Sequence, residues 1–297
     1  MANDVLNEGT IFAGYDRAGL DREYDNRAKV ADASVISERW LANGKAARAS
    51  MSCLLDVPYG SHERHRLDIF PVSKPGAPIL AFVHGGYWHM RDKTLVHFIE
   101  PGYVAAGINF VSIGYRLCPE VGIGDVVEDV RDALGWVHGH AADFDGDAEQ
   151  LYVAGHSAGG HLAAMMCGPS GMAPGMLKGG CSISGLHDLE PIRLCYLNSS
   201  LGLDEATART LSPIALAQAM QPGAEDLPPV ILTVGGDEGA EYLRQRDALA
   251  IALRAARQPV SIVENPGTNH FSACEAFCDP AHPLSDAMLR LILAPRF

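Results

Sequence analysis

One segment constrains the fold of this chain more than any other. An apolar, strand-like run over residues 151–154 leads into Gly155-His156-Ser157-Ala158-Gly159, and a helical pattern follows at once. The order strand, G-x-S-x-G and helix is typical of a strained turn that lifts a serine hydroxyl above a sheet, with glycines where a side chain would collide with neighbouring backbone. The first amides of the helix would then favour negative charge that develops beside Ser157. The segment therefore predicts a nucleophilic serine on an α/β scaffold.

Apolar, β-rich segments alternate with helical patterns through most of the chain. This alternation is typical of a mostly parallel sheet covered by helices on both faces. Together with the Ser157 segment, it predicts the α/β-hydrolase fold. The expected strands span residues 66–70, 79–84, 109–115, 151–154, 180–184, 230–234 and 260–264, and the expected crossover helices span residues 126–138 and 241–256.

The chain is long and apolar enough for one large core. It has 297 residues, of which 47% are hydrophobic, so we expect a single domain over residues 1–297. Residues 1–50 depart from the alternation, with charges, glycines and a best candidate helix at 38–47, and we expect them to form a small cap. Residues 188–229 are a second irregular stretch, interpreted as an insertion near the site.

Composition disfavours several classes of function. The formal net charge of −13 repels phosphate backbones and anionic membrane surfaces, so neither nucleic acid nor a membrane is an expected partner. No apolar run is long enough to span a bilayer, no signal-peptide pattern is present, and the seven cysteines do not resemble a disulfide framework, so we expect a cytoplasmic protein. Cys274 and Cys278 lack partner ligands at zinc-site spacing, and no metal or cofactor is expected. A homodimer is compatible with all of these features.

A serine nucleophile needs a base, and that base needs a carboxylate to orient it. In this fold the chain order is Ser, acid, His. Asp237 and Glu238 follow the expected strand 230–234, and His270 follows the expected strand 260–264. Both loops lie where a parallel sheet exposes its carboxyl edge, the edge that also presents Ser157. Among the 12 histidines only His270 combines this position with the required order, so it is predicted to be the base.

Acyl transfer also needs hydrogen-bond donors for the oxyanion. The segment 81–88, Ala-Phe-Val-His-Gly-Gly-Tyr-Trp, places a Gly-Gly pair after a buried strand, where backbone can approach a substrate. We therefore expect the amides of Gly86, Tyr87 and Ala158 to form the oxyanion hole. His156 and His161 are expected to pack or hydrogen-bond locally. Expected substrate contacts are Trp88, Leu186 and His187, with Tyr196 as a further candidate for specificity. Core packing is an equal alternative for Trp88.

At this point the sequence resembles a family, the kynurenine formamidase (arylformamidase) and esterase branch of the hormone-sensitive-lipase-like α/β hydrolases. The resemblance spans nearly the whole chain and implies cofactor-free hydrolysis of a small acyl or formyl derivative. It also implies that Glu238 is the acid, because it stands three residues before a Glu-aromatic pair, where family members often have Asp; Asp237 remains the alternative. The segments that carry the resemblance are 23–27 (EYDNR), 84–88 (HGGYW), 155–161 (GHSAGGH), 184–191 (SGLHDLEP) and 236–242 (GDEGAEY).

These residues lead to three hypotheses about function. The first is a serine hydrolase that cleaves small carboxylic esters through an acyl-enzyme. The second, implied by the resemblance, is hydrolysis of arylformamides such as N-formylkynurenine. The third is a catalytically silent relative that binds a ligand, since fold does not fix function. Silent relatives typically lack a member of the triad, whereas Ser157, a carboxylate and His270 are all present here.

Overall fold

The computed structural model describes residues 9–223 and 226–294. Its centre is an eight-stranded sheet with the order β1-β2-β4-β3-β5-β6-β7-β8, in which β1 and β2 run antiparallel to their neighbours and all other pairs are parallel. The fold prediction is confirmed. The strands are β1 (Leu54–Pro58), β2 (Arg66–Phe70), β3 (Ala77–Val83), β4 (Asn109–Ile113), β5 (Gly146–His156), β6 (Leu177–Ile183), β7 (Val230–Thr233) and β8 (Val260–Ile262).

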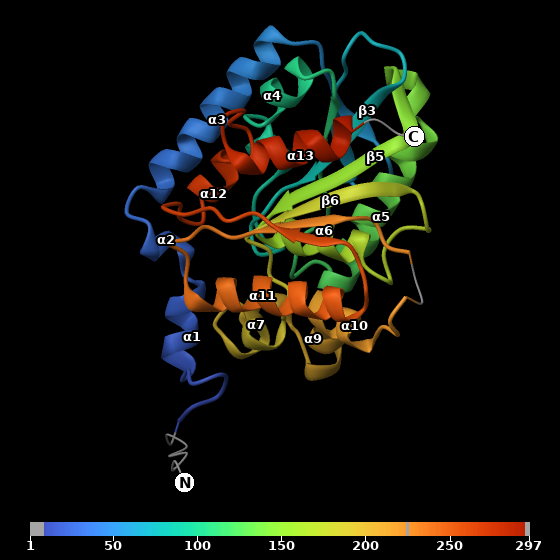
Figure 1. Cartoon of the computed structure of the whole chain (residues 1–297). Helices are drawn as coiled ribbons and strands as arrows, with labels where there is room; N and C mark the ends of the chain where they lie inside the picture. Colours follow the sequence, from blue (N-terminus) through green and yellow to red (C-terminus); the bar gives the residue numbers. More distant parts are fainter. Residues whose placement is uncertain (1–8, 224–225, 295–297) are drawn as a thin grey trace.

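Helices cover both faces of the sheet (Figure 1). One face carries α3 (Ala33–Ser50), α4 (Glu100–Ala105), α12 (Ser272–Glu275) and α13 (Pro283–Leu293), and the other carries α5 (Ile123–Gly139), α6 (Ala158–Cys167) and α11 (Ala240–Ala255). Because successive side chains of a strand point to opposite faces, β3 serves both apolar cores. Ile79, Ala81 and Val83 pack in the core beneath α5 and α6, whereas Leu80 and Phe82 pack in the core beneath α3 and α13.

All seven predicted strands form, with ends that shift by a few residues. The strand that sequence reasoning missed is β1, because it pairs only with β2 and lies mostly exposed, so it carries no buried apolar run. The helix expected over residues 38–47 is part of the longer α3. Short 3-10 helices, η1 (Lys93–Val96) and η2 (Ala141–Phe144), complete the loops around the sheet.

The parallel strands bring distant loops together at one edge. In the register of the sheet, Val83 of β3 is opposite Gly155 of β5, His156 is opposite Ile183 of β6, and Ile183 is opposite Thr233 of β7. The loops that follow these four strands therefore meet at the carboxyl edge, where α/β sheets bind their ligands.

Two irregular regions lie beside this edge. The N-terminal one contains α1 (Arg17–Tyr24) and α2 (Asn26–Lys29) ahead of α3. The other packs outside α11 in Figure 1 and contains α7 (Glu190–Leu194), α8 (Asn198–Leu201), α9 (Glu205–Thr210) and α10 (Pro213–Ala219).

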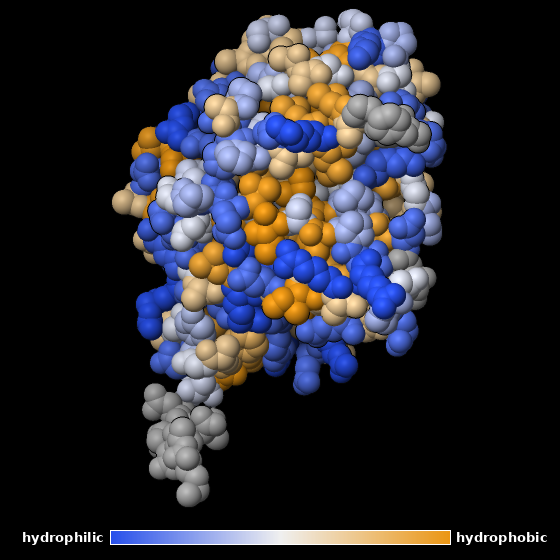
Figure 2. Space-filling view, viewed as in Figure 1, coloured by the Kyte–Doolittle hydropathy of each residue, from blue (hydrophilic) through white to orange (hydrophobic). Residues whose placement is uncertain are grey.

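The surface of the molecule mixes polar and apolar regions. Figure 2 shows an apolar area on the face between α11 and α13, where β8 closes the sheet. Ile251 of α11 and Leu293 of α13 are 65% and 50% exposed. Within the described residues, no helix combines the length and the apolar character needed to cross a membrane.

Candidate active site

Ser157 occupies a sharp turn between β5 and α6. Its φ and ψ angles are 59° and −120°, a strained conformation for a residue with a side chain. The Ser157 amide donates a hydrogen bond to the carbonyl oxygen of Ile183, at 2.8 Å, which fixes the turn against β6. A Cβ at position 159 would stand 2.0 Å from the carbonyl oxygen of Val83, so only glycine fits there. The predicted strand-turn-helix geometry around Ser157 is therefore present.

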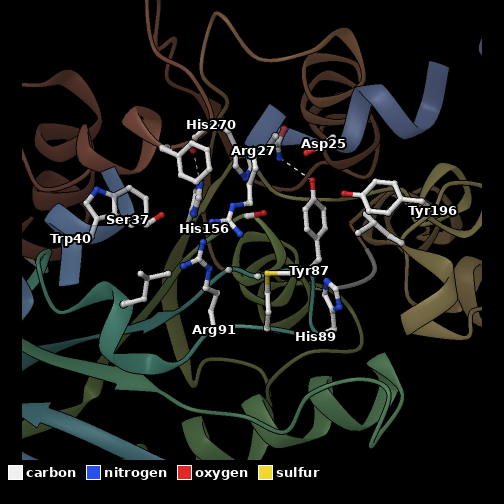
Figure 3. A pocket seen from close by; sticks show the side chains of 18 residues that line it. Asp25, Arg27, Ser37, Trp40, Tyr87, His89, Arg91, His156, Tyr196 and His270 are labelled. Carbon is white, nitrogen blue, oxygen red and sulfur yellow. Dashed lines mark hydrogen bonds between the residues drawn. The ribbon is translucent and has the colours of Figure 1, made fainter. Parts of the chain in front are cut away.

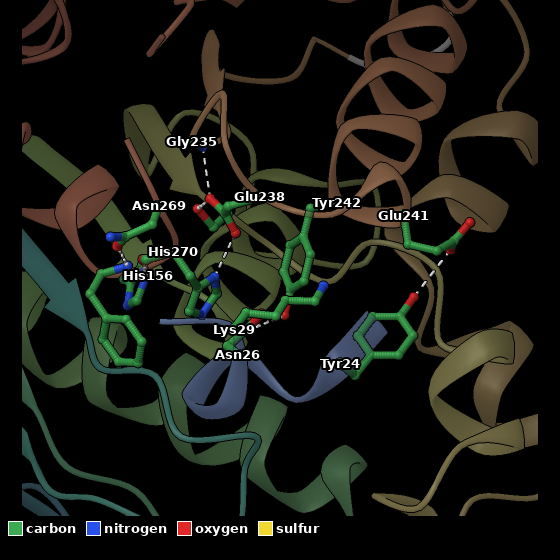
Figure 4. Close-up of polar contacts among 12 residues, drawn as sticks. Tyr24, Asn26, Lys29, His156, Gly235, Glu238, Glu241, Tyr242, Asn269 and His270 are labelled. Carbon is green, nitrogen blue, oxygen red and sulfur yellow. Dashed lines mark hydrogen bonds and ion pairs between the residues drawn. The ribbon is translucent and has the colours of Figure 1, made fainter. Parts of the chain in front are cut away.

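His270 and Glu238 form a close pair (Figure 4). His270 Nδ1 lies 2.6 Å from Glu238 Oε2. The other oxygen of this carboxylate, Oε1, accepts hydrogen bonds from the Ser184 hydroxyl and from the Gly235 amide, the latter at 2.7 Å. Three donors thus fix the carboxylate and stabilise its negative charge. Asp237, the alternative acid, is exposed. Its backbone amide donates a hydrogen bond to the carbonyl oxygen of Thr268, in the loop that carries His270.

The loop that carries His270 is itself held in place by His156. The Nε2 of His156 lies 2.8 Å from the carbonyl oxygen of His270 and must donate to it. Burial, together with the nearby His270, lowers the pKa of His156 well below its usual range, so the ring is neutral. Tyr242 packs on the other side, with its ring centroid 5.1 Å from that of His270. His156 therefore hydrogen-bonds locally, as expected from the sequence.

The loop after β3 supplies backbone donors. Gly86 has φ of 122°, and a Cβ there would meet the carbonyl oxygen of Met90 at 2.2 Å, so the loop can turn tightly only with glycine. Among the described residues, the amides of Gly86, Tyr87 and Ala158 donate no hydrogen bond. These three amides are free to bind an oxyanion. The buried ring of His84 supports this loop, with its Nδ1 2.7 Å from the carbonyl oxygen of Gly85. Burial lowers the pKa of His84 to about 4.

The N-terminal region is tied to this loop through Tyr87. The Tyr87 hydroxyl donates to the carbonyl oxygen of Tyr24 at 2.6 Å and accepts from Asn26 Nδ2 at 2.9 Å. The same Asn26 amide donates to the hydroxyl of Tyr242 at 2.7 Å, and the two tyrosine hydroxyls are 2.9 Å apart. Since Asn26 is buried, these bonds link the N-terminal region, the loop after β3 and α11 into one network.

A cavity of about 130 Å³ opens at this point (Figure 3). Ser157 and His270 line it together with Gly86 and Tyr87, so the structure brings together the predicted nucleophile, base and oxyanion loop. The other lining side chains come mainly from the N-terminal region (Asp25, Asn26, Arg27), from α3 (Ser37, Trp40), from the loop through Arg91 and from the insertion (Tyr196, Leu197).

Three predicted substrate contacts are corrected by the structure, because Trp88, Leu186 and His187 lie in the core and do not line the cavity. Trp88 is fully buried and its Nε1 donates to Nδ1 of His161 at 3.3 Å. Leu186 belongs to the core beneath α6, and His187 Nε2 lies 3.2 Å from the Ser182 hydroxyl. The insertion over residues 188–229 does contribute Tyr196, which was a candidate from the sequence, and Leu197, which was not.

Sequence reasoning gave no role to several residues of the site. Ser184 is the first residue after β6, and Glu238 lies in the loop after β7, the neighbouring strand. This shared position at the carboxyl edge is a signal that could have identified Ser184. Trp40 and Arg91 line the cavity from a helix and a loop whose sequences resemble ordinary surface segments. In the described parts of the chain, no group of three or more His, Cys, Asp or Glu side chains could hold a metal ion.

Comparison with known proteins adds independent information. A family described as BD-FAE matches residues 67–173. Kynurenine formamidase of Danio rerio is 31% identical over 252 residues, which cover 83% of this chain and 84% of that protein. A candidate carboxylic ester hydrolase of Mycobacterium tuberculosis is 28% identical over 243 residues, covering 72% and 55%. A crystal structure of a candidate thioesterase from Silicibacter superposes with a TM-score of 0.78 at 30% identity, covering 93% of this chain and 99% of that one.

The geometry predicts that Glu238 and Asp237 differ sharply in importance. Replacing Glu238 with Ala removes the group that orients His270, so kcat for 4-nitrophenyl acetate should fall by about 10⁴-fold. The neighbouring Asp237→Ala variant is the matched control and should retain normal turnover. Near-normal hydrolysis by Glu238→Ala would contradict the assignment.

Proposed function

The chain belongs to the kynurenine formamidase family of α/β hydrolases, and we propose on this premise that it is a serine hydrolase of small carboxylic esters. Ser157 is the proposed nucleophile, His270 the general base and Glu238 the carboxylate that orients it. The observation that carries this proposal is the 2.6 Å contact between His270 and Glu238 at a cavity that Ser157 also lines.

The first half of the proposed reaction forms an acyl-enzyme. His270 removes the proton of the Ser157 hydroxyl as its oxygen attacks the carbonyl carbon of the substrate. The oxyanion that develops is bound by the amides of Gly86, Tyr87 and Ala158, which have no other acceptor among the described residues. Loss of one such donor costs on the order of 3 kcal/mol in the barrier. His270 then protonates the leaving alcohol or amine.

The second half releases the acid. Water enters the position of the leaving group, His270 takes one of its protons, and the resulting hydroxide attacks the acyl carbon. Collapse of the second tetrahedral intermediate returns the proton to Ser157. Throughout the cycle Glu238 keeps Nδ1 of His270 protonated, so that Nε2 is the nitrogen that exchanges protons with substrate.

The small cavity favours a short acyl group but fits two kinds of substrate. A volume of about 130 Å³ accommodates a formyl or acetyl group with part of its leaving group. We place carboxylic esters first, because the proposed mechanism needs only a small acyl group and a competent leaving group. Hydrolysis of arylformamides is the second candidate, supported by the kinship with the Danio rerio kynurenine formamidase.

Further proposals concern the protein as a whole. We propose one domain over residues 1–297, because the sheet serves both apolar cores. A cytoplasmic location is supported by the seven cysteines, all of which are free thiols. A homodimer is supported by the apolar area between α11 and α13 and by β8, whose outer edge pairs with no strand of the described chain.

Covalent labelling tests the nucleophile directly. A fluorophosphonate probe should label the intact protein, because an activated serine attacks phosphorus much as it attacks a carbonyl. The Ser157→Ala variant should remain folded by circular dichroism and take up no label. An intact protein that stays unlabelled would instead favour a catalytically silent binding protein.

Parallel kinetics separate the two substrate classes. We expect a higher kcat/KM for 4-nitrophenyl acetate and phenyl acetate than for N-formylkynurenine, because an ester carbonyl is more electrophilic than an amide carbonyl. Phenyl acetate controls for the activated leaving group of the nitrophenyl ester. A kcat/KM for the formamide that exceeds both esters by orders of magnitude would reject the ester proposal.

The mass in solution tests the homodimer. Size-exclusion chromatography with light scattering should give about twice the 31.7 kDa of one chain. Ile251→Asp places a charge in the exposed apolar area and should shift the protein toward a single chain. A monomer at every concentration of the unmodified protein would exclude this proposal.

A further inference from the structure

Two arginine side chains line the same cavity as Ser157. Arg27 follows directly after the buried Asn26 in α2, and Arg91 ends the loop that carries Gly86 and Tyr87. Figure 3 draws both guanidinium groups within the cavity, in the part that also contains His270. The proposed mechanism of acyl transfer assigns no task to either side chain.

Neither guanidinium has a partner of opposite charge among the described residues. Several buried or half-buried arginines elsewhere do: Arg116 pairs with Asp129 at 2.6 Å, and Arg244 pairs with Asp188 at 2.8 Å. No hydrogen bond or ion pair is made by the side chain of Arg27 or of Arg91 within the described chain. In a protein of net charge −13, these two guanidinium groups place unpaired positive charge at one cavity.

Arg91 is held close to the oxyanion loop. Its Cγ lies 2.8 Å from the point where a Cβ of Gly86 would stand, so the stem of the side chain crosses the loop that supplies the oxyanion donors. The Arg91 backbone has φ of 81°, which is strained for a residue with a side chain, and Arg64 holds its carbonyl oxygen through a 2.7 Å hydrogen bond. Strain of this kind persists where the surrounding structure enforces it and is concentrated at functional sites.

The surroundings of Arg91 disfavour its positive charge. Burial lowers the pKa of Arg91, and repulsion from Arg27 lowers it further. Asp25 is the only carboxylate that lines the cavity within the described residues, but it accepts a 3.1 Å hydrogen bond from the Ala28 amide at the start of α2 and forms no ion pair with either arginine. An anion bound between Arg27 and Arg91 would offset both the burial and the repulsion.

We infer that the natural substrate carries a carboxylate, which Arg27 and Arg91 bind while Ser157 attacks the scissile carbonyl. This inference rests on the proposed function, because it names the substrate class of the same site. Guanidinium groups bind carboxylates through paired hydrogen bonds and so fix orientation as well as charge. The two arginines determine specificity. By binding the carboxylate of the substrate, they position its acyl carbon for attack by Ser157.

Two matched pairs of esters test the inference and show which end of the substrate carries the charge. For the leaving group, the pair is 3-acetoxybenzoate and its methyl ester. For the acyl group, the pair is the mono-4-nitrophenyl ester of glutaric acid and 4-nitrophenyl pentanoate. We expect the charged member of one pair to have a kcat/KM at least about tenfold higher, mostly through a lower KM, as hydrogen bonds to charged groups provide.

Variants then assign the preference to the arginines. Arg91→Gln and Arg27→Gln should each lower the charged-to-neutral ratio of kcat/KM by about tenfold or more, and Arg91→Lys should restore part of it. Arg254→Gln is the matched control, because it removes one exposed positive charge of α11 outside the cavity and should leave the ratio unchanged. Equal rates for the members of both pairs, or equal losses for charged and neutral esters in Arg91→Gln, would overturn the inference.

A binding measurement separates this inference from the proposed function. In the Ser157→Ala background, titration calorimetry should detect binding of the preferred charged ester, and Arg91→Gln should weaken that binding by about tenfold or more. Hydrolysis of the neutral esters by the unmodified enzyme without any charged-ester preference would overturn the inference and leave the hydrolase proposal intact. Binding that depends on Arg91 in a protein that cleaves no ester would support the carboxylate site and reject the hydrolase.

Discussion

The close approach of β3 and the first turn of α6 is the constraint on which the rest of the site depends. With Val83 and Gly159 in backbone contact, the chain must turn sharply at Ser157 to pass from strand to helix. That turn places the serine side chain in the wall of the cavity, at the carboxyl edge of the sheet, and next to it the amide of Ala158, the first residue of α6. A side chain at residue 159 would separate strand from helix, and the turn would be lost together with the proposed oxyanion donor and the proposed nucleophile.

The sequence was sufficient to predict those features of the fold and the site that depend on short motifs and on chain order. The glycines around Ser157 and the chain order of Ser157, Glu238 and His270 follow from the requirements of a parallel sheet, and the structure brings all three residues to one edge. The seven strands could be predicted because they are apolar runs of regular spacing. The exposed β1 was missed for the same reason, since an edge strand with little burial has no such pattern.

The residues that line the cavity could not be predicted from local sequence patterns. Trp88 was expected near substrate because it follows the oxyanion loop, but two successive residues with positive φ turn its side chain into the core toward His161. Arg27 and Arg91 are 64 positions apart, and no periodicity or motif relates them. Their meeting is a property of tertiary packing, in which α2 closes over the loop after β3.

The hydrogen bonds of the Tyr87 hydroxyl limit which residues of this enzyme can change independently during evolution. Its one proton goes to the carbonyl of Tyr24, and its oxygen accepts from Asn26 and lies against the hydroxyl of Tyr242. The N-terminal region, the loop after β3 and α11 are thereby held in a single arrangement. Asn26, Tyr87 and Tyr242 contribute side chains to it, so that a change at one of these three weakens the bonds of the other two. Change at Asn26 in the N-terminal region is therefore coupled to the loop that carries the proposed oxyanion donors, so this region must evolve together with the candidate site beside it.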